Sequence, residues 1–385
     1  MKLPRVKYSA FLLGAAMWIA PGICAAQDGA DGARTMANPL PTNQYMVTDL
    51  ASNASSGAPF TDANMVNPWG MSRSSGSPWW LADNGTGLST LYAGTGQVIP
   101  LVVTVPAAKS GMGQAGSPTG TIFNGTTEFG LPGGNPAIFL FATEDGTISG
   151  WNPKANPTNA LIAVNESQMG ASFKGLTAAT VNMPGMTAQT FLYAADFTLG
   201  RVEVFDGMFH HVRSIEDQFS QGEDDLPDGF APFNVQNLGG NIFVSYAKQG
   251  SGINEQDGPG LGRVRVYTPD GRMVLKLEKG SWMNAPWGMA IAPSDFGPYS
   301  HSILVGNFGS GWIAAFDPVT GKFEDFLRDA NGKPLGIAGL WGISPGNDGK
   351  AGNATSLYFA AGGANENMGT FGSITAMQNS LGNAQ

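Results

Sequence analysis

The sequence predicts an all-β fold, a six-bladed β-propeller with four-stranded antiparallel blades. Pro-Trp-Gly-Met occurs at 68–71 and again at 286–289, 218 residues apart, which is four steps of about 54 residues. Related segments fill the intermediate steps, and one more follows the last step. With 55 Gly and 25 Pro in 385 residues, the chain is rich in turns, which favours many short strands over long helices.

Each of the six units begins with one of these entry segments, at 68–71, 117–120, 173–176, 231–234, 286–289 and 339–342. A second, largely apolar segment follows, at 79–87, 138–146, 191–200, 241–249, 302–311 and 356–363. A third follows at 88–94, 147–153, 201–207, 263–271, 312–318 and 373–378. The third segments alternate apolar and polar residues, as half-buried strands do. Five units add a fourth segment, so three or four short strands repeat six times, which is typical of propeller blades.

The sixth unit ends after its third segment, and the strand-like segment 44–52 precedes the first entry without a partner of its own. We expect 44–52 to supply the outer strand of the last blade and to close the ring, which hides the exposed sheet edges. The propeller is therefore expected over 44–378, followed by a flexible tail over 379–385.

The first 26 residues read as a signal peptide. Lys2, Arg5 and Lys7 precede a short apolar run, and Cys24 and Ala26 are small residues at the expected cleavage site. We expect export to the periplasm or the cell exterior, with a flexible leader over 27–43. Cys24 is the only cysteine, so cleavage would leave a chain without disulfides, thiol nucleophiles or cysteine metal sites.

The formal net charge is −9, and only 13% of residues are charged. No cluster of Lys and Arg is present, which argues against nucleic acid or an anionic membrane as a partner. No apolar run after the signal approaches the length of a membrane span. We expect a monomer that binds a small molecule, a glycan or a protein.

In a propeller, the loops before the first strand and between the second and third strands share one face, here called the mouth. Polar residues end the second strands there, and the metal-ligand candidates among them are Asp83, Glu144, Asp196 and Asn307. Oxygen ligands around a channel suit Ca²⁺, the one cofactor that the pattern suggests. Turn capping by Asp and Asn explains the same residues and stays open as the simpler interpretation. The three histidines fall on the opposite face, so the mouth offers none for zinc or general-base work.

The entry segments also place Trp69, Phe233, Trp287 and Trp341 at the mouth, together with Lys248 at the end of a second strand. These five residues are the candidates for ligand binding, because an aromatic ring stacks on sugars and other flat ligands. Packing between adjacent blades is the alternative role of the aromatic side chains. The Gly-rich stretch 249–262 interrupts the fourth unit at the mouth and suits a lid.

Several segments, among them NPWGM, WWLADNGTGLSTLY, IFLFATEDGTISGWNP and ILVGNFGSGWIAAFDPVTG, resemble an uncharacterised family of secreted bacterial proteins related to NHL-type propellers. The resemblance runs from about residue 45 to 376 and implies the six-bladed fold and export, but no catalytic residue. A more distant resemblance, to lactonase-like propellers that hold Ca²⁺ through Glu, Asn and Asp, rests on fold alone.

The sequence thus favours a secreted binding or scaffold module that recognises a ligand or partner at the mouth. A Ca²⁺-dependent lactonase-like or esterase-like hydrolase that uses mouth carboxylates is the alternative, and the sequence leaves open whether the protein is an enzyme.

Overall fold

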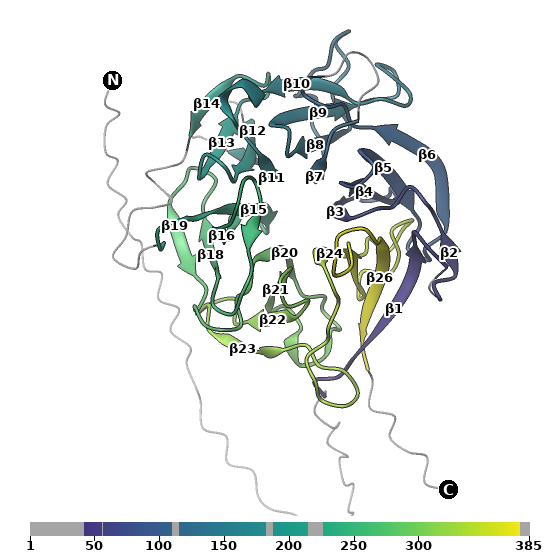
Figure 1. Ribbon diagram of the computed structural model, residues 1–385, viewed down its shortest axis with the longest axis vertical. Helices are drawn as coiled ribbons and strands as arrows, with labels where there is room; N and C mark the ends of the chain where they lie inside the picture. The colour runs from purple at the N-terminus through teal and green to yellow at the C-terminus, as the bar shows by residue number, and fades with distance from the viewer. Residues whose placement is uncertain (1–41, 56, 110–114, 182–187, 215–225, 378–385) are drawn as a thin grey trace, which may run out of the picture. The chain divides into compact units, whose positions relative to one another are not determined.

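The computed structural model describes residues 42–55, 57–109, 115–181, 188–214 and 226–377. The predicted signal peptide, nearly all of the predicted leader and the predicted tail lie outside these ranges. Six small antiparallel sheets stand around a common axis, and Figure 1 looks along that axis into the ring. The prediction of a six-bladed, all-β propeller is confirmed.

Blades 1 to 3 follow one another along the chain. Blade 1 consists of β3 (Pro68–Ser72), β4 (Trp79–Asp83), β5 (Leu88–Tyr92) and β6 (Val98–Thr104). Blade 2 consists of β7 (Pro118–Phe123), β8 (Phe139–Thr143), β9 (Thr147–Trp151) and β10 (Leu161–Asn165), followed by the short 3₁₀ turn η1 (Ser167–Met169). Blade 3 consists of β11 (Phe173–Val181), β12 (Gln189–Asp196), β13 (Arg201–Phe205) and β14 (His211–Ser214).

Blades 4 to 6 complete the ring. Blade 4 consists of β15 (Phe230–Leu238), β16 (Asn241–Gln249), β18 (Gly262–Tyr267) and β19 (Met273–Lys276), and the small strand β17 (Glu255–Gln256) pairs with the end of β16. Blade 5 consists of β20 (Pro286–Ile291), β21 (Ile303–Asn307), β22 (Ile313–Phe316) and β23 (Phe323–Phe326), with the turn η2 (Gly297–Tyr299) after β20. Blade 6 consists of β24 (Leu340–Pro345), β25 (Leu357–Ala361), β26 (Thr370–Ala376) and β1 (Tyr45–Ser52).

Strand β1 closes the ring, as the unpaired segment 44–52 predicted. It pairs antiparallel with β26, from Tyr45 opposite Ala376 to Ser52 opposite Thr370. The short strand β2 (Phe60–Thr61), which the sequence pattern did not indicate, adds to the outer edge of β1 in parallel. The Tyr45 hydroxyl donates to Phe296 O at 2.9 Å, which ties the closing strand to blade 5.

The inner strands crowd at the axis, and glycine makes their close approach possible. The first strand of every blade carries a register shift just after its entry, between Pro68 and Met71 in blade 1 for example. In five blades the shifted segment contains Gly70, Gly120, Gly175, Gly288 or Gly342. A Cβ on Gly70 would lie 2.4 Å from the main-chain oxygen of Thr119 in the next blade, so no larger residue fits there.

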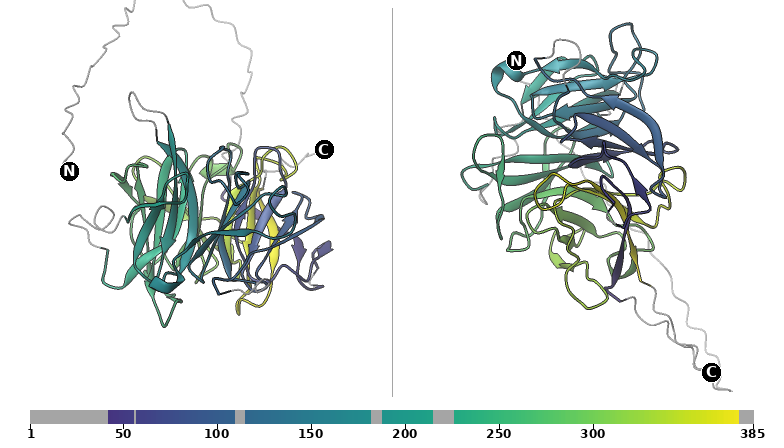
Figure 2. Two further views of the ribbon diagram at one scale, coloured as in Figure 1. Left: turned by 90° about the horizontal axis from the view of Figure 1, so that it is seen from above. Right: turned by 45° about the vertical axis from the view of Figure 1, so that its right-hand side comes forward.

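The hydrophobic core lies between blades rather than within one layer. Six clusters of buried side chains each join two neighbouring blades, so every blade interface around the ring has one. The seventh cluster, built around the entry tryptophans, lies at the axis. Figure 2 shows the blades standing side by side when the ring is seen from its edge. No helix among the described residues is long and apolar enough to span a membrane.

Candidate functional site

One end of the ring gathers the loops that the sequence assigned to the mouth. In each blade, a main-chain N–H at the end of the second strand or just after it donates to a carbonyl in the entry loop. The pairs are 84 to 67, 144 to 117, 197 to 172, 249 to 229, 308 to 285 and 362 to 339. The six equivalent bonds confirm that both kinds of loop share one face and that residues after the second strands surround the axis.

The predicted aromatic residues come together at the axis and are buried. Trp69 stacks on Trp341 with ring centroids 3.6 Å apart, and Trp287 meets both indoles edge-on at 6.0 and 5.8 Å. Phe233 packs against the same pair, and no ring of the four is more than 4% exposed. These four residues, called the collar below, contact one another across the ring. Their predicted role in ligand binding stays a prediction.

Lys174 takes the collar position in blade 3, where the entry reads Phe-Lys-Gly instead of Pro-Trp-Gly. Its side chain is completely buried, and its ammonium forms an ion pair with Glu144 from blade 2. The Lys174 Nζ lies 4.9 Å from the ring centroid of Trp69, a cation–π distance. Lys174 occupies the position of the entry tryptophan in its repeat, which indicates a place at the collar. It was nevertheless not among the predicted site residues.

A polar network surrounds the ion pair. Asn84 Nδ2 donates to the second carboxylate oxygen of Glu144 at 2.9 Å. On the other side, Trp341 Nε1 donates to Asn67 Oδ1 at 2.8 Å, and Asn67 Nδ2 donates to Glu366 Oε2 at 2.9 Å. The side chains around the collar are therefore linked from blade to blade.

Glu255 joins this network from the insertion in blade 4 that the sequence assigned to a lid. Burial raises the pKa of its carboxyl to about 7, opposed by the positive charge of Lys174 and reinforced by Glu366 and Glu144. A carboxyl group with this pKa exchanges its proton near neutral pH. The carboxylates of Glu144, Glu255 and Glu366 thus interact electrostatically with the fully buried ammonium of Lys174 or with one another.

Two cavities adjoin the collar. At the mouth, a cavity of about 250 Å³ is edged by Asp257 and Phe308 and otherwise lined by small residues of three loops, at 309–311, 338–339 and 363–364. The Phe308 ring stacks on Trp341 at 4.1 Å, so the cavity adjoins the collar. Its walls are largely main chain, which offers fixed hydrogen-bonding groups to a ligand.

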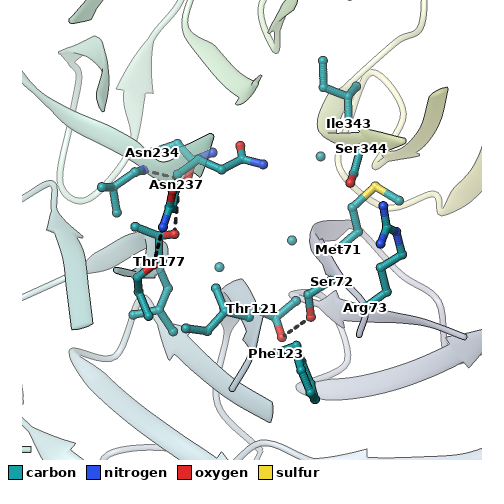
Figure 3. Close-up of a pocket in the computed structure, with 18 of the residues that line it drawn as sticks. Met71, Ser72, Arg73, Thr121, Phe123, Thr177, Asn234, Asn237, Ile343 and Ser344 are labelled. Atoms are coloured by element: carbon teal, nitrogen blue, oxygen red, sulfur yellow. Dashed lines mark hydrogen bonds between the residues drawn. The ribbon is translucent and has the colours of Figure 1, made fainter. Parts of the chain in front are cut away.

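The second cavity, of about 310 Å³, lies in the channel and is lined by the inner strands and Trp287. Figure 3 shows side chains from the inner strands of blades 1, 2, 3, 4 and 6 around it, with Ser72 and Thr121 joined by a hydrogen bond. Four of its polar residues, Ser72, Thr121, Thr177 and Asn237, form bonds between neighbouring inner strands. They brace the channel wall.

The predicted metal ligands do not form a common group. Asp83 accepts the hydroxyl of Thr90 in its own hairpin, and Asn307 accepts the N–H of Asn284 and donates to Trp312 O. Glu144 pairs with Lys174. Lys248, a predicted ligand-binding residue, donates to Asp228 O at 2.6 Å within its own blade.

Asp196 lies in a group with two acids that the sequence analysis did not single out. Glu166, Asp196 and Glu203 each offer an oxygen within 4.8 Å of the others, and all three are buried. Burial raises the pKa of Asp196 to about 6 and also raises the pKa of Glu166. Arg201 and His211 bond to the carboxylate of Glu203. His211 begins β14 and thus contacts a buried acid of the neighbouring strand.

No family model matches the chain. An uncharacterized protein of Acanthamoeba polyphaga mimivirus is 29% identical over 82% of this chain and 78% of its own length. A second from the same virus is 34% identical over 54% of this chain and 38% of its own length. These relatives are viral, so the predicted bacterial and secreted character stays a prediction.

Among solved structures, a streptogramin B lyase superposes with a TM-score of 0.50 at 11% identity, over 86% of this chain and 98% of its own. A glucose dehydrogenase superposes with a TM-score of 0.50 at 12% identity, over 86% of this chain and 99% of its own. Likeness at this identity supports the propeller fold alone.

Proposed function

We propose that this protein is a binding module whose mouth recognises a small ligand rich in hydrogen-bond donors, such as a protonated amine or a polyol. The observation that carries the proposal is the mouth cavity beside the collar. It combines an aromatic wall at Phe308, a carboxylate at Asp257 and main-chain walls from glycine-rich loops. An aromatic wall with one carboxylate is a common arrangement for such ligands.

The charge of the mouth supports the same class of ligand. Glu144 is already neutralised by Lys174, whereas Glu255 and Glu366 add negative charge around it. Asp257 is exposed at the cavity edge. A ligand that donates hydrogen bonds or carries positive charge meets favourable potential here, and an anionic ligand does not.

Glycine is needed in the cavity wall because a side chain would fill it or strain the loops. Gly311 has φ +70°, and a Cβ there would lie 2.3 Å from Ile337 O. Gly339 has φ +64°, and its Cβ would lie 2.3 Å from Gly363 O. Close packing of three main-chain segments thus gives the cavity a fixed shape, which lowers the entropy cost of binding.

The test is a titration of the purified protein followed by tryptophan fluorescence, since three collar residues are tryptophan. Two probe series would be used, amines (ethanolamine, putrescine, choline) and polyols (glycerol, glucose, myo-inositol). Binding by one series, weakened at least about tenfold by Asp257→Asn or Phe308→Ala, is the expected result. Asp49→Asn, an exposed acid on β1, is the matched control. No response to either series, or equal binding by the Asp257 variant, would refute the proposal.

A hydrolase that uses mouth carboxylates is the second candidate, and Glu255 favours it. With a pKa near 7, this carboxyl suits general acid–base work at neutral pH. Hydrolysis of γ-butyrolactone or 4-nitrophenyl acetate that is lost in Glu255→Gln, and a comparison of activity in Ca²⁺ and in EDTA, would test this alternative. Export remains part of the proposal, supported by the signal-like pattern of residues 1–26.

A further inference from the structure

The buried acids Glu166, Asp196 and Glu203 converge from three separate elements. Glu166 lies in the link between blades 2 and 3, Asp196 ends β12, and Glu203 is in the middle of β13. Their exposed fractions are 8%, 0% and 0%. Three carboxylates brought within 4.8 Å in the interior repel one another strongly unless something compensates their charge.

The hydrogen bonds do not account for all of the carboxylate oxygens. Asp196 Oδ1 accepts the N–H groups of Ser172 and Leu199, at 3.2 and 3.0 Å, but Asp196 Oδ2 has no partner among the described residues. Glu166 Oε2 is likewise buried without a partner there, and so is the hydroxyl of Ser172, which is 1% exposed and whose main-chain N–H bonds to Asp196. Buried polar atoms are normally paired, so unpaired atoms on two acids of the group and on a residue bonded to it indicate a missing partner.

The charge of the group fits the same reading. Among the described residues, Arg201 is the guanidinium that bonds to the group, through Glu203, and the three carboxylates with this one guanidinium carry a formal charge of −2. The bonds from Arg201 and His211 do not prevent Glu203 from binding a metal, since a carboxylate has about four lone-pair sites.

We propose that Glu166, Asp196 and Glu203 bind a hard divalent cation of the Ca²⁺ class between blades 2 and 3. Carboxylate and hydroxyl oxygens are the ligands that such cations prefer, and no nitrogen or sulfur ligand is required. Two oxygens bound to one Ca²⁺ at about 2.4 Å lie at most ~4.8 Å apart, and one oxygen of each acid lies within this limit of the others. Ser172, whose main-chain N–H bonds to Asp196, offers a buried hydroxyl oxygen as a further candidate ligand.

This site differs in place and role from the mouth cavity. Its residues lie on the second and third strands of blade 3 and on the link that follows blade 2, whereas the mouth cavity is bordered by the insertion of blade 4 and by blades 5 and 6. The cation cross-links blade 3 to the end of blade 2. Its loss is expected to lower stability without abolishing ligand binding, so the two proposals fail independently.

The experiment uses the full chain, stripped with EDTA and desalted. Calorimetric titration with CaCl₂ and, separately, MgCl₂ would measure binding directly, and melting curves would measure its effect. We expect saturable binding of one cation per chain and a melting temperature several degrees higher with the cation than with EDTA. Asp196→Asn and Glu166→Gln should each weaken binding at least about tenfold, because each removes one charged ligand.

Asp62→Asn is the matched control. Asp62 is also a buried acid, but its carboxylate accepts the N–H of Asn64 and the hydroxyl of Tyr92, and among the described residues it belongs to no such group. It should leave the titration unchanged. Absence of heat and of any melting shift with both cations would overturn the proposal. So would equal binding by wild type and the Asp196 variant, because the cation would then bind elsewhere.

Discussion

The ion pair between Lys174 and Glu144 makes a quantitative prediction about the collar. Lys174→Met keeps most of the side-chain volume but removes the only charge that pairs with Glu144 among the described residues. The Lys174 side chain is 0% exposed and the Glu144 side chain 14%, so water reaches the stranded carboxylate only in part. Breaking a buried pair from one side costs about 3–5 kcal/mol. Loss of the ammonium over Trp69 adds about 1 kcal/mol.

Urea unfolding followed by tryptophan fluorescence would measure the change, because three indoles of the collar report on this region. Glu144→Gln instead leaves the Lys174 ammonium without its charged partner and should lower the free energy of unfolding by a similar amount. The double variant should be more stable than the sum of the two losses predicts, by about 1.5 kcal/mol or more, since it leaves no unpaired charge. The exposed Lys333→Met is the control, with an expected change within about 0.5 kcal/mol. A loss below about 1 kcal/mol for Lys174→Met, or additive single losses, would contradict this account of the collar.

Three further predictions concern Glu255, an inner-strand glycine and a blade-to-blade hydrogen bond. The pKa of Glu255 is raised above its ordinary value of 4.5 to about 7, so the folded chain binds this proton more tightly and stability falls as pH rises between those values. In Glu255→Gln the loss of unfolding free energy over this pH range should be smaller by about 1–3 kcal/mol. Urea midpoints at pH 4.5 to 8 would measure it. Gly120→Ala places a Cβ 2.5 Å from the main-chain nitrogen of Leu176 and should lower the free energy of unfolding by about 1–3 kcal/mol. Gly336→Ala adds a Cβ in open space and should not destabilise the protein. Melting curves of the two variants would test this. Trp79→Phe leaves the main-chain oxygen of Ala351 in blade 6 without its donor, Trp79 Nε1, which lies 2.8 Å away. The free energy of unfolding, measured in urea, should fall by about 1–3 kcal/mol. An unchanged midpoint would show that water replaces the bond.

The fold was predictable because propeller blades repeat a local pattern. Entry segments, alternating third strands and turn residues specify each blade from within about 54 residues, and the unpaired segment 44–52 then had one place left to pair. The strands β2 and β17 were missed because each is two residues long and depends on its neighbour for pairing.

The site was less predictable, since its residues meet across blades. Glu203 lies in the alternating strand Arg-Val-Glu-Val-Phe, where a charged residue indicates a solvent-facing position, yet it is completely buried against blade 2 and His211. Polar residues that end the second strands, such as Asp83 and Asn307, bond mainly within their own loops. The residues one position later, Glu144 and Phe308, face the axis. Local sequence does not show which of two adjacent loop residues points inward.

Ring closure also constrains how the chain reaches its native state. Blades 1 to 5 each form from one continuous stretch, so most of their pairings are local. Blade 6 needs Tyr45 opposite Ala376, and this strand pair closes a loop of more than 300 residues. During synthesis, β1 is made first but has no strand to pair with until the last blade is complete. We expect the seam between β1 and β26 to form last in folding, after five blades have already assembled around the axis.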